Sequence, residues 1–182
     1  PREYFTRAVE KVYGNKTYFQ YGRFNEDAID YREIQLADFV ILDGIENIPQ
    51  SFDRYKNYND FLIIPSKTID KASYQRFLSR SVHQISDSIA IGLNIKDLND
   101  PFFSGIFNTK EVDIGLLKAK RNIEVNGRLN VLVENKFEKA FLGNVESNNH
   151  YIYFFSSPLT SEFTNITNHA TFLPLMYKMS LG

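Results

Sequence analysis

The fold is decided by the stretch Phe39-Val-Ile-Leu-Asp-Gly44 and its counterpart Phe61-Leu-Ile-Ile-Pro-Ser66. Each half is a short apolar run without polar alternation, which is typical of a strand buried on both faces of a parallel sheet. Asp43-Gly44 and Pro65-Ser66 are turn residues, and they end the two runs sharply. The sequence therefore predicts two neighbouring parallel strands joined by a crossover.

The crossover between these strands is predicted to contain a short helix over Ser51–Tyr58. Ser51 is a suitable N-cap residue, and Phe52 and Tyr55 fall on one helical face. A strand, a crossover and a parallel strand form a βαβ unit, which is almost always right-handed.

The remaining pattern predicts helices and then mostly strands. Helices are expected at 1–13, 26–36, 71–82 (capped by Asp70 or Thr68) and 168–181, with Pro174 causing a kink or a late start in the last. Strands are expected at 17–21, at 89–91 before Gly92, and at 122–125, 129–133, 139–142 and 151–155. Asn126-Gly127 predicts a tight hairpin between 122–125 and 129–133. The expected fold class is α/β, a three-layer structure whose mainly parallel sheet is flanked by helices, with an antiparallel hairpin section in the C-terminal half.

Composition limits the possible functions. A chain of 182 residues with 43% hydrophobic residues fits a single domain over 1–182. A formal net charge of −1 provides no field to attract nucleic acid, so no nucleic-acid partner is expected. Without cysteine the chain has no disulfide, thiolate metal site or cysteine nucleophile. No apolar run reaches the roughly 20 residues of a membrane span.

Polar residues collect where the predicted parallel strands end. In open α/β sheets, ligands bind beyond the carboxyl ends of the strands. That edge is expected to carry Asp43, Gly44, Glu46, Asn47, Ser66 and Lys67, joined by Ser156 and Ser157 if 151–155 belongs to the same sheet. These residues form a candidate edge for a small ligand, a peptide or a protein partner. The alternative is that they only end strands and cap helices, because Asp, Gly and Ser are common turn residues.

No motif in the sequence predicts catalysis or a cofactor. Ser66, His169 and Asp43 have the chemistry of a hydrolytic triad, but Ser66 lies outside a Gly-x-Ser-x-Gly elbow. The histidines His83, His150 and His169 lack ligand partners at metal-site spacing, and no glycine-rich nucleotide loop is present. We therefore expect no catalytic residue, no metal and no cofactor.

The C-terminal stretch resembles a known family. The residues that carry the resemblance are Tyr151-Ile-Tyr-Phe-Phe-Ser-Ser-Pro-Leu159, Glu162-Phe-Thr-Asn165 and His169-Ala-Thr-Phe-Leu-Pro-Leu-Met-Tyr-Lys-Met179. They are similar to a segment of the BatA-domain membrane proteins of Bacteroidetes, in which a Trp stands at the position of Phe163. The stretches 38–49 and 61–66 look like the paired strands of that family, so the resemblance covers most of 36–82 and 150–181.

The resemblance implies an architecture and a location. Proteins of that family carry N-terminal membrane helices, usually a von Willebrand A-like domain, and then a domain resembling class I glutamine amidotransferases with a flavodoxin-like fold. The amidotransferase nucleophile is a cysteine, and the matching turn here is Pro65-Ser66-Lys67, so no functional residue is carried over. We expect a non-catalytic domain that binds a protein partner, on the periplasmic side of the cell envelope, within an assembly linked to aerotolerance or stress. Its membrane attachment would lie in parent segments outside this chain. The alternative is a small-ligand or peptide-binding domain, or a residual hydrolase, that uses the edge near Asp43 and Ser66.

Overall fold

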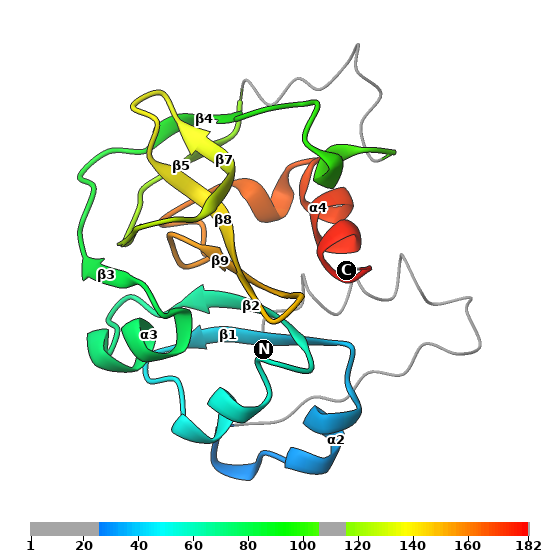
Figure 1. The fold of residues 1–182 in the computed structure, drawn as a ribbon. Helices are drawn as coiled ribbons and strands as arrows, with labels where there is room; N and C mark the ends of the chain where they lie inside the picture. The colour runs from blue at the N-terminus through cyan, green and yellow to red at the C-terminus, as the bar shows by residue number, and fades with distance from the viewer. Residues whose placement is uncertain (1–25, 106–115, 182) are drawn as a thin grey trace.

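One mixed sheet forms the centre of the protein. The computed structural model describes residues 26–105 and 116–181, and within them seven strands lie in the order β1-β2-β9-β8-β7-β4-β5 (Figure 1). The strands are β1 (Phe39–Ile45), β2 (Asp60–Pro65), β4 (Ile91–Ile95), β5 (Lys118–Ala119), β7 (Asn130–Asn135), β8 (Ala140–Ser147) and β9 (His150–Phe155). A separate two-stranded ribbon pairs β3 (Ser81–Gln84) with β6 (Ile123–Asn126).

The pairing of neighbouring strands changes from parallel to antiparallel once across the sheet, at β9. β1 pairs with β2 and β2 pairs with β9 in parallel, as predicted for a βαβ unit and for a returning 151–155 strand. The pairs β9–β8, β8–β7, β7–β4 and β4–β5 are antiparallel. The predicted α/β class, with parallel strands and an antiparallel section, is confirmed.

Helices cover both faces of the sheet. They are η1 (Glu26–Ala28), α2 (Tyr31–Leu36), η2 (Gln50–Arg54), α3 (Lys71–Leu78), η3 (Pro101–Phe103), η4 (Ile166–Asn168) and α4 (Phe172–Met179). β2 is buried along its whole length because its side chains alternate between two core clusters. Leu62 and Ile64 pack in the cluster that includes α4, whereas Phe61 and Ile63 pack in the cluster that includes η2, α3 and the ribbon.

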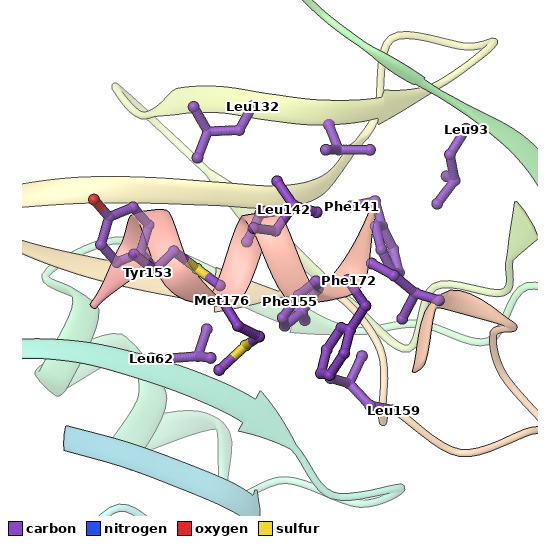
Figure 2. Packing of buried hydrophobic residues seen from close by; sticks show 14 of the residues in the cluster. Leu62, Leu93, Leu132, Phe141, Leu142, Tyr153, Phe155, Leu159, Phe172 and Met176 are labelled. Atoms are coloured by element: carbon purple, nitrogen blue, oxygen red, sulfur yellow. The ribbon is translucent and has the colours of Figure 1, made fainter. Parts of the chain in front are cut away.

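The core on the α4 side joins the parallel and antiparallel parts of the sheet. Figure 2 shows Phe172 and Met176 of α4 among strand residues such as Phe155 and Leu142. Leu132 of β7 belongs to the same cluster. One helix therefore stabilises strands from both parts of the sheet, because burial of each large apolar side chain contributes about 1.5–3 kcal/mol.

Helix α3 forms largely as predicted. The Asp70 carboxylate accepts a hydrogen bond from the Ser73 amide at 2.7 Å, which makes Asp70 the N-cap. Tyr74, Phe77 and Leu78 are buried, as their spacing predicts. The helix ends at Leu78 rather than at residue 82, since the next residue adopts a left-handed conformation and 81–84 forms β3.

Two predicted elements near the sheet differ from the structure. The crossover contains only a 3-10 helix, and Ser51 lies inside it rather than at its N-cap. The Ser51 hydroxyl bonds instead to the Tyr31 hydroxyl at 2.6 Å, and Pro49 precedes the helix. The strand predicted at 89–91 actually begins at Ile91 and continues through Gly92. Nothing lies within 4 Å of the position that a Cβ would take at Gly92, so the strand leaves room for a side chain there.

The predicted Asn126-Gly127 hairpin is wrong. β6, which precedes this dipeptide, pairs with β3, and β7, which follows it, pairs with β4 and β8. Gly127 does adopt a positive φ of 115°, so the dipeptide makes a turn without joining paired strands. The two-residue hairpin lies instead at Asn148-Asn149, between β8 and β9, where both residues have positive φ.

The C-terminal helix starts late, as Pro174 predicts. α4 begins at Phe172, which places Pro174 in its first turn. Backbone N–H groups in the first turn have no helical partner, so the N–H that proline lacks costs the helix no hydrogen bond. The elements predicted at 1–13 and 17–21 lie outside the described residues. No helix in the described part of the chain has the length and hydropathy to span a membrane.

Candidate functional site

The carboxyl ends of the parallel strands meet at one edge. In Figure 1 the arrowheads of β1 and β2 point to the side where α3 and β3 lie. Residue 43 pairs with Ile64 and residue 45 with Pro65, so the turns after β1 and β2 are adjacent. β9 lies beside β2 and brings Ser156 and Ser157 to this edge, as expected if 151–155 joined the sheet. The predicted candidate residues are therefore brought to one edge.

The turn after β1 supports α3. Gly44 has a φ of 65°, and the β1–β2 register shifts between residues 43 and 45. Beyond it, the Glu46 carbonyl accepts a hydrogen bond from the Asp70 amide at 2.8 Å. The Tyr74 hydroxyl donates to the Ile45 carbonyl at 2.6 Å. The backbone of this turn thus holds the first half of α3, while the side chains of Asp43, Glu46 and Asn47 are exposed.

Tyr74 is the most strongly perturbed acid beside this turn. Its side chain is fully buried, and burial raises the pKa of the phenol far above its ordinary value. The phenol therefore remains a neutral hydrogen-bond donor to the turn. Its geometry is structural, because its hydroxyl is already directed at a backbone carbonyl.

The turn after β2 is held through its main chain. The Ser66 amide donates to the Ile45 carbonyl at 3.1 Å. The Ser66 and Lys67 carbonyls both accept from the Asn122 side-chain amide, at 2.9 and 3.1 Å. The Lys67 ammonium reaches outward to Glu162 at 3.1 Å in an exposed ion pair, which contributes little to stability.

Asn122 and Gln84 connect the strand ends, and sequence analysis missed this role. Asn122 is only 3% exposed. The backbone amides of Asn122 and Ile123 both donate to the Ser156 carbonyl, at 2.7 and 3.0 Å. The Gln84 side-chain amide donates to the carbonyls of Lys67 and Asn122, both at 3.1 Å. We call this set of contacts the strand-end bridge. In sequence Asn122 appears only as the start of a β-type run.

Two hydroxyls at the edge lack partners. The Ser156 and Ser157 side chains are fully buried, and neither hydroxyl oxygen makes a hydrogen bond. A buried polar atom without a partner costs about 1–3 kcal/mol. These two hydroxyls are therefore buried, unsatisfied polar groups at this edge.

His169 and Ser66, two residues of the hypothetical triad, make their hydrogen bonds with other partners. His169 Nδ1 lies 3.0 Å from the Thr171 hydroxyl, just before α4. The described hydrogen bonds of Ser66 involve its backbone. His150 contacts Asp60 at 3.1 Å, at the opposite, amino-terminal edge of the sheet. Across 26–105 and 116–181, no cluster of three metal-ligating His, Asp or Glu side chains occurs.

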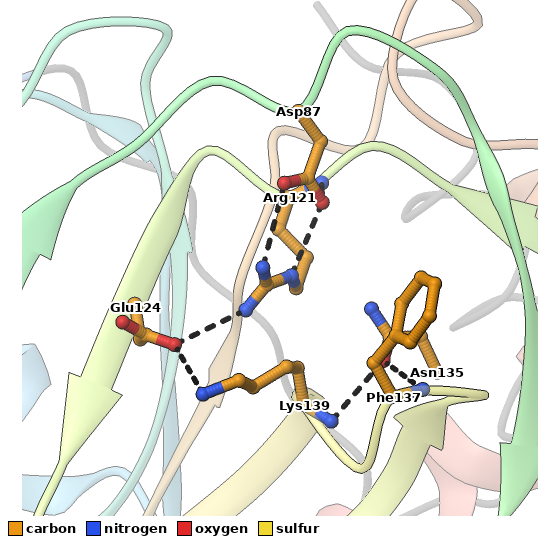
Figure 3. A network of polar contacts seen from close by, with 6 residues as sticks. All are labelled: Asp87, Arg121, Glu124, Asn135, Phe137 and Lys139. Carbon is orange, nitrogen blue, oxygen red and sulfur yellow. Dashed lines mark hydrogen bonds and ion pairs between the residues drawn. The ribbon is translucent and has the colours of Figure 1, made fainter.

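A charged network fixes the ribbon to the antiparallel part of the sheet. Figure 3 shows Arg121 between Asp87 and Glu124, with nearest N–O distances of 3.1 and 3.5 Å. The Lys139 ammonium lies 3.1 Å from the same Glu124 carboxylate. Hydrogen bonding from Lys139 is the largest effect that lowers the pKa of Glu124, and the nearby positive charges add to it. The strand-end bridge is therefore carried by a ribbon that is anchored at a second place.

Comparison with known proteins places this geometry in a fold class. The sequence matches no protein-family model and no curated protein. Among solved structures, a cytoplasmic protein of Salmonella typhimurium is similar, with a TM-score of 0.66 and 12% identity over 98% of this chain and 85% of that chain. A second cytoplasmic protein, from strain LT2 of that species, has a TM-score of 0.59 and 10% identity over 97% and 82%. A thua-like protein of Parabacteroides merdae has a TM-score of 0.54 and 12% identity over 98% and 84%.

These similarities define the fold and leave the activity open. Identities of 10–12% over nearly the whole chain show a shared architecture. ThuA-like proteins belong to the glutamine amidotransferase-like superfamily and have a flavodoxin-like fold. The chain therefore shares the α/β architecture of these proteins, with the flavodoxin-like arrangement that its sequence predicts.

Proposed function

We propose that this chain is a non-catalytic glutamine amidotransferase-like domain that acts by binding a protein partner. The observation that carries the proposal is the strand-end bridge. This bridge lies at the edge where open α/β sheets bind ligands. There the side-chain amides of Asn122 and Gln84 donate hydrogen bonds to the carbonyls of Ser66 and Lys67. The carbonyls of Ser66 and Lys67 and the Ser66 amide are therefore already hydrogen-bonded within the protein.

The parent protein is part of the same proposal. The Ser-Pro-Leu stretch at 157–159 and the His-Ala-Thr-Phe-Leu-Pro-Leu-Met-Tyr stretch at 169–177 support an origin in a BatA-domain membrane protein of Bacteroidetes. In that setting the domain would be tethered to the cell envelope on the periplasmic side and would function in aerotolerance. The membrane segments would belong to the parent chain.

A small-ligand site is the second candidate function. The observation that favours it is the pair of buried, unpartnered hydroxyls of Ser156 and Ser157 beside the bridge. A ligand with hydrogen-bonding groups would satisfy both. Such a ligand would stabilise the folded state in proportion to the logarithm of its concentration above the dissociation constant.

Two measurements test the proposed function. First, the 182-residue chain is assayed with glutamine, ester and peptide substrates beside the Ser66→Ala and Ser157→Ala variants. We expect no turnover that depends on either serine, and turnover lost in one variant would overturn the non-catalytic assignment. Second, a protein captured by the full-length parent from envelope membranes is purified and its affinity for the domain is measured.

The binding measurement also separates the two candidate functions. Direct binding of a purified protein partner supports an interaction domain. The combined variant Asp43→Ala, Glu46→Ala, Lys67→Ala shows whether the exposed strand-end side chains contribute. Failure of every captured protein to bind, together with a concentration-dependent thermal shift from a small molecule, would favour the ligand site instead.

A further inference from the structure

The Asn126-Gly127 dipeptide ends the ribbon without joining paired strands. It is the only Asn-Gly pair in the 182-residue sequence. Asn126 is the last residue of β6 and pairs with Ser81 of β3, whereas Gly127 begins the turn toward β7. Both residues are exposed, and Gly127 has a φ of 115°. The dipeptide therefore places an asparagine and a glycine at a strand end that solvent reaches.

An Asn-Gly pair contains the two groups of a self-reaction. The backbone nitrogen of the glycine bonds to the side-chain carbonyl carbon of the asparagine, and the carboxamide nitrogen leaves as ammonia, taking the proton of the glycine N–H. The product is a five-membered succinimide ring, which water opens at either carbonyl. One opening leaves an aspartate, and the other leaves an isoaspartate, whose main chain continues through the former side chain. Glycine favours the first step because it has no side chain to hinder its nitrogen.

The two groups that react are free in the structure. Within the described residues, neither the Gly127 amide nor the Asn126 carboxamide makes a hydrogen bond. In the same part of the chain β6 pairs only with β3, so no second strand holds its other edge. The attack therefore breaks no contact of either group.

A positive charge lies beside the reacting amide. Cδ of Arg80 lies 3.1 Å from the position that a Cβ would take at Gly127. The Arg80 guanidinium is fixed there, because it donates to the carbonyls of Arg128 and Ser79 at 2.7 and 2.8 Å. A nearby positive charge favours both loss of the amide proton and formation of a carboxylate.

We propose that Asn126 is a site of spontaneous deamidation in the folded protein, and that the isoaspartate formed there weakens the pairing of β3 with β6. Water is the only co-reactant. The aspartate product adds a negative charge and keeps the backbone of β6. The isoaspartate product moves a methylene group into the main chain and turns the Asn126 carbonyl, which belongs to the pair with Ser81, into a free carboxylate. The last pair of the ladder is thereby lost.

Mass spectrometry of the ageing protein tests the site. The 182-residue chain is kept folded in mildly alkaline buffer, and samples are digested at acidic pH. We expect the peptide that contains Asn126 to gain the mass of an amide-to-acid change roughly tenfold faster than the peptide that contains Asn149, which is exposed in a turn but precedes His150. Protein isoaspartate methyltransferase should label the same peptide.

A variant shows that the side chain of Asn126 is the reacting group. Asn126→Gln lengthens the side chain by one methylene, so the attack would have to close a six-membered ring. We expect the mass gain and the methyltransferase label to be lost from this peptide, while the slow gain at Asn149 continues. An unchanged circular dichroism spectrum confirms that the variant is folded.

Comparison of the two products tests the effect on the ribbon. The isoaspartate form is isolated by chromatography, and Asn126→Asp supplies the aspartate form with the same charge. We expect the isoaspartate form to unfold at a lower urea concentration than Asn126→Asp. The amides of Val82 and Val125, which form the neighbouring pair, should also exchange with deuterium faster in the isoaspartate form.

Other outcomes would overturn the proposal. A mass gain at Asn126 no faster than at Asn149, or one that occurs only after unfolding in urea, would show that the folded turn prevents the attack. A gain that persists in Asn126→Gln would place the reaction at another residue. Equal urea midpoints and exchange rates for the isoaspartate form and Asn126→Asp would refute the effect on the pairing of β3 with β6.

Discussion

Asn122 connects three backbone segments by itself. Its side chain donates to the Ser66 and Lys67 carbonyls, and its own amide donates to the Ser156 carbonyl. In Asn122→Asp the carboxylate has no N–H to donate and its charge faces two carbonyl oxygens. We expect the free energy of unfolding at pH 7 to fall by about 1–3 kcal/mol in urea denaturation.

The control for Asn122→Asp is Asn126→Asp. Asn126 is exposed at the far end of β6, the strand that Asn122 immediately precedes, so the same change in chemistry should alter stability by less than about 0.5 kcal/mol. Equal effects of the two substitutions would mean that the strand-end bridge does not stabilise the fold.

The structural roles of some residues can be predicted from the sequence, and those of others cannot. The Asp70 cap and the buried Tyr74 and Phe77 follow from local spacing, and the structure confirms them. Asn122 could not be found in this way because its partners Ser66 and Lys67 lie 56 and 55 positions earlier. A contact of that range depends on the sheet topology, which a short sequence window does not contain.

At the scale of elements, the β8–β9 hairpin contains a testable turn. Asn148 and Asn149 have φ values of 50° and 65°, which fits the two-residue turn that favours Asn-Gly. Asn149→Gly should therefore stabilise the protein by about 0.5 kcal/mol, measured by thermal and urea unfolding. The same substitution at Asn126, whose φ is not positive, should destabilise by a similar amount. Destabilisation by Asn149→Gly would contradict this description of the turn.

The connection between the ribbon and the β7–β8 hairpin is sensitive to pH. Ion pairing with Lys139 and Arg121 lowers the folded-state pKa of Glu124 below its ordinary value of 4.5. The Glu124 carboxylate therefore binds a proton less readily in the folded state than in the unfolded state. The resulting stabilisation is complete above about pH 4.5 and is lost as the pH falls through the lower folded-state pKa.

Substitution of Glu124 tests whether its charged carboxylate stabilises the folded protein at neutral pH. Glu124→Gln should lower the free energy of unfolding by about 0.5 kcal/mol at pH 7, and the difference from the native chain should shrink below pH 4. Glu138→Gln removes an exposed carboxylate from the β7–β8 turn, next to Lys139, and serves as the control. A Glu124→Gln effect that is constant from pH 7 to pH 3 would show that the carboxylate charge is not its cause.

Strand pairing was the least predictable property of the elements. Asn126-Gly127 and Asn148-Asn149 both provide positive φ, yet only the second joins paired strands. A turn dipeptide specifies a local reversal, whereas pairing depends on which strands bury their side chains together. Here Val82 and Ile123 are both fully buried in the core that includes α3, so β6 pairs with β3.

At the scale of the whole molecule, the parallel strands at the centre of the sheet could be predicted, because their apolar side chains must be buried on both faces. A run such as Phe61–Ile64 must be covered on both faces, and a layered α/β arrangement does so. The strand order then places Asp43 and Ser66 at one edge, as predicted. The ribbon that bridges this edge could not be predicted, because it combines segments on either side of the intervening β4–β5 region.

Close packing at β8 joins the parallel and antiparallel parts of the sheet. Gly143, in the middle of β8, permits this, because a Cβ there would lie 2.9 Å from the Asn130 carbonyl oxygen and 3.0 Å from the Phe154 ring. Gly143→Ala should therefore lower the free energy of unfolding by about 1–3 kcal/mol through overpacking. Gly92→Ala, in β4, is the matched control, since nothing lies within 4 Å of its Cβ position and it should be neutral or slightly stabilising. If the two variants unfold at the same urea concentration, β8 has room to move away from its neighbours, and the close junction between the two parts of the sheet is not what holds them together.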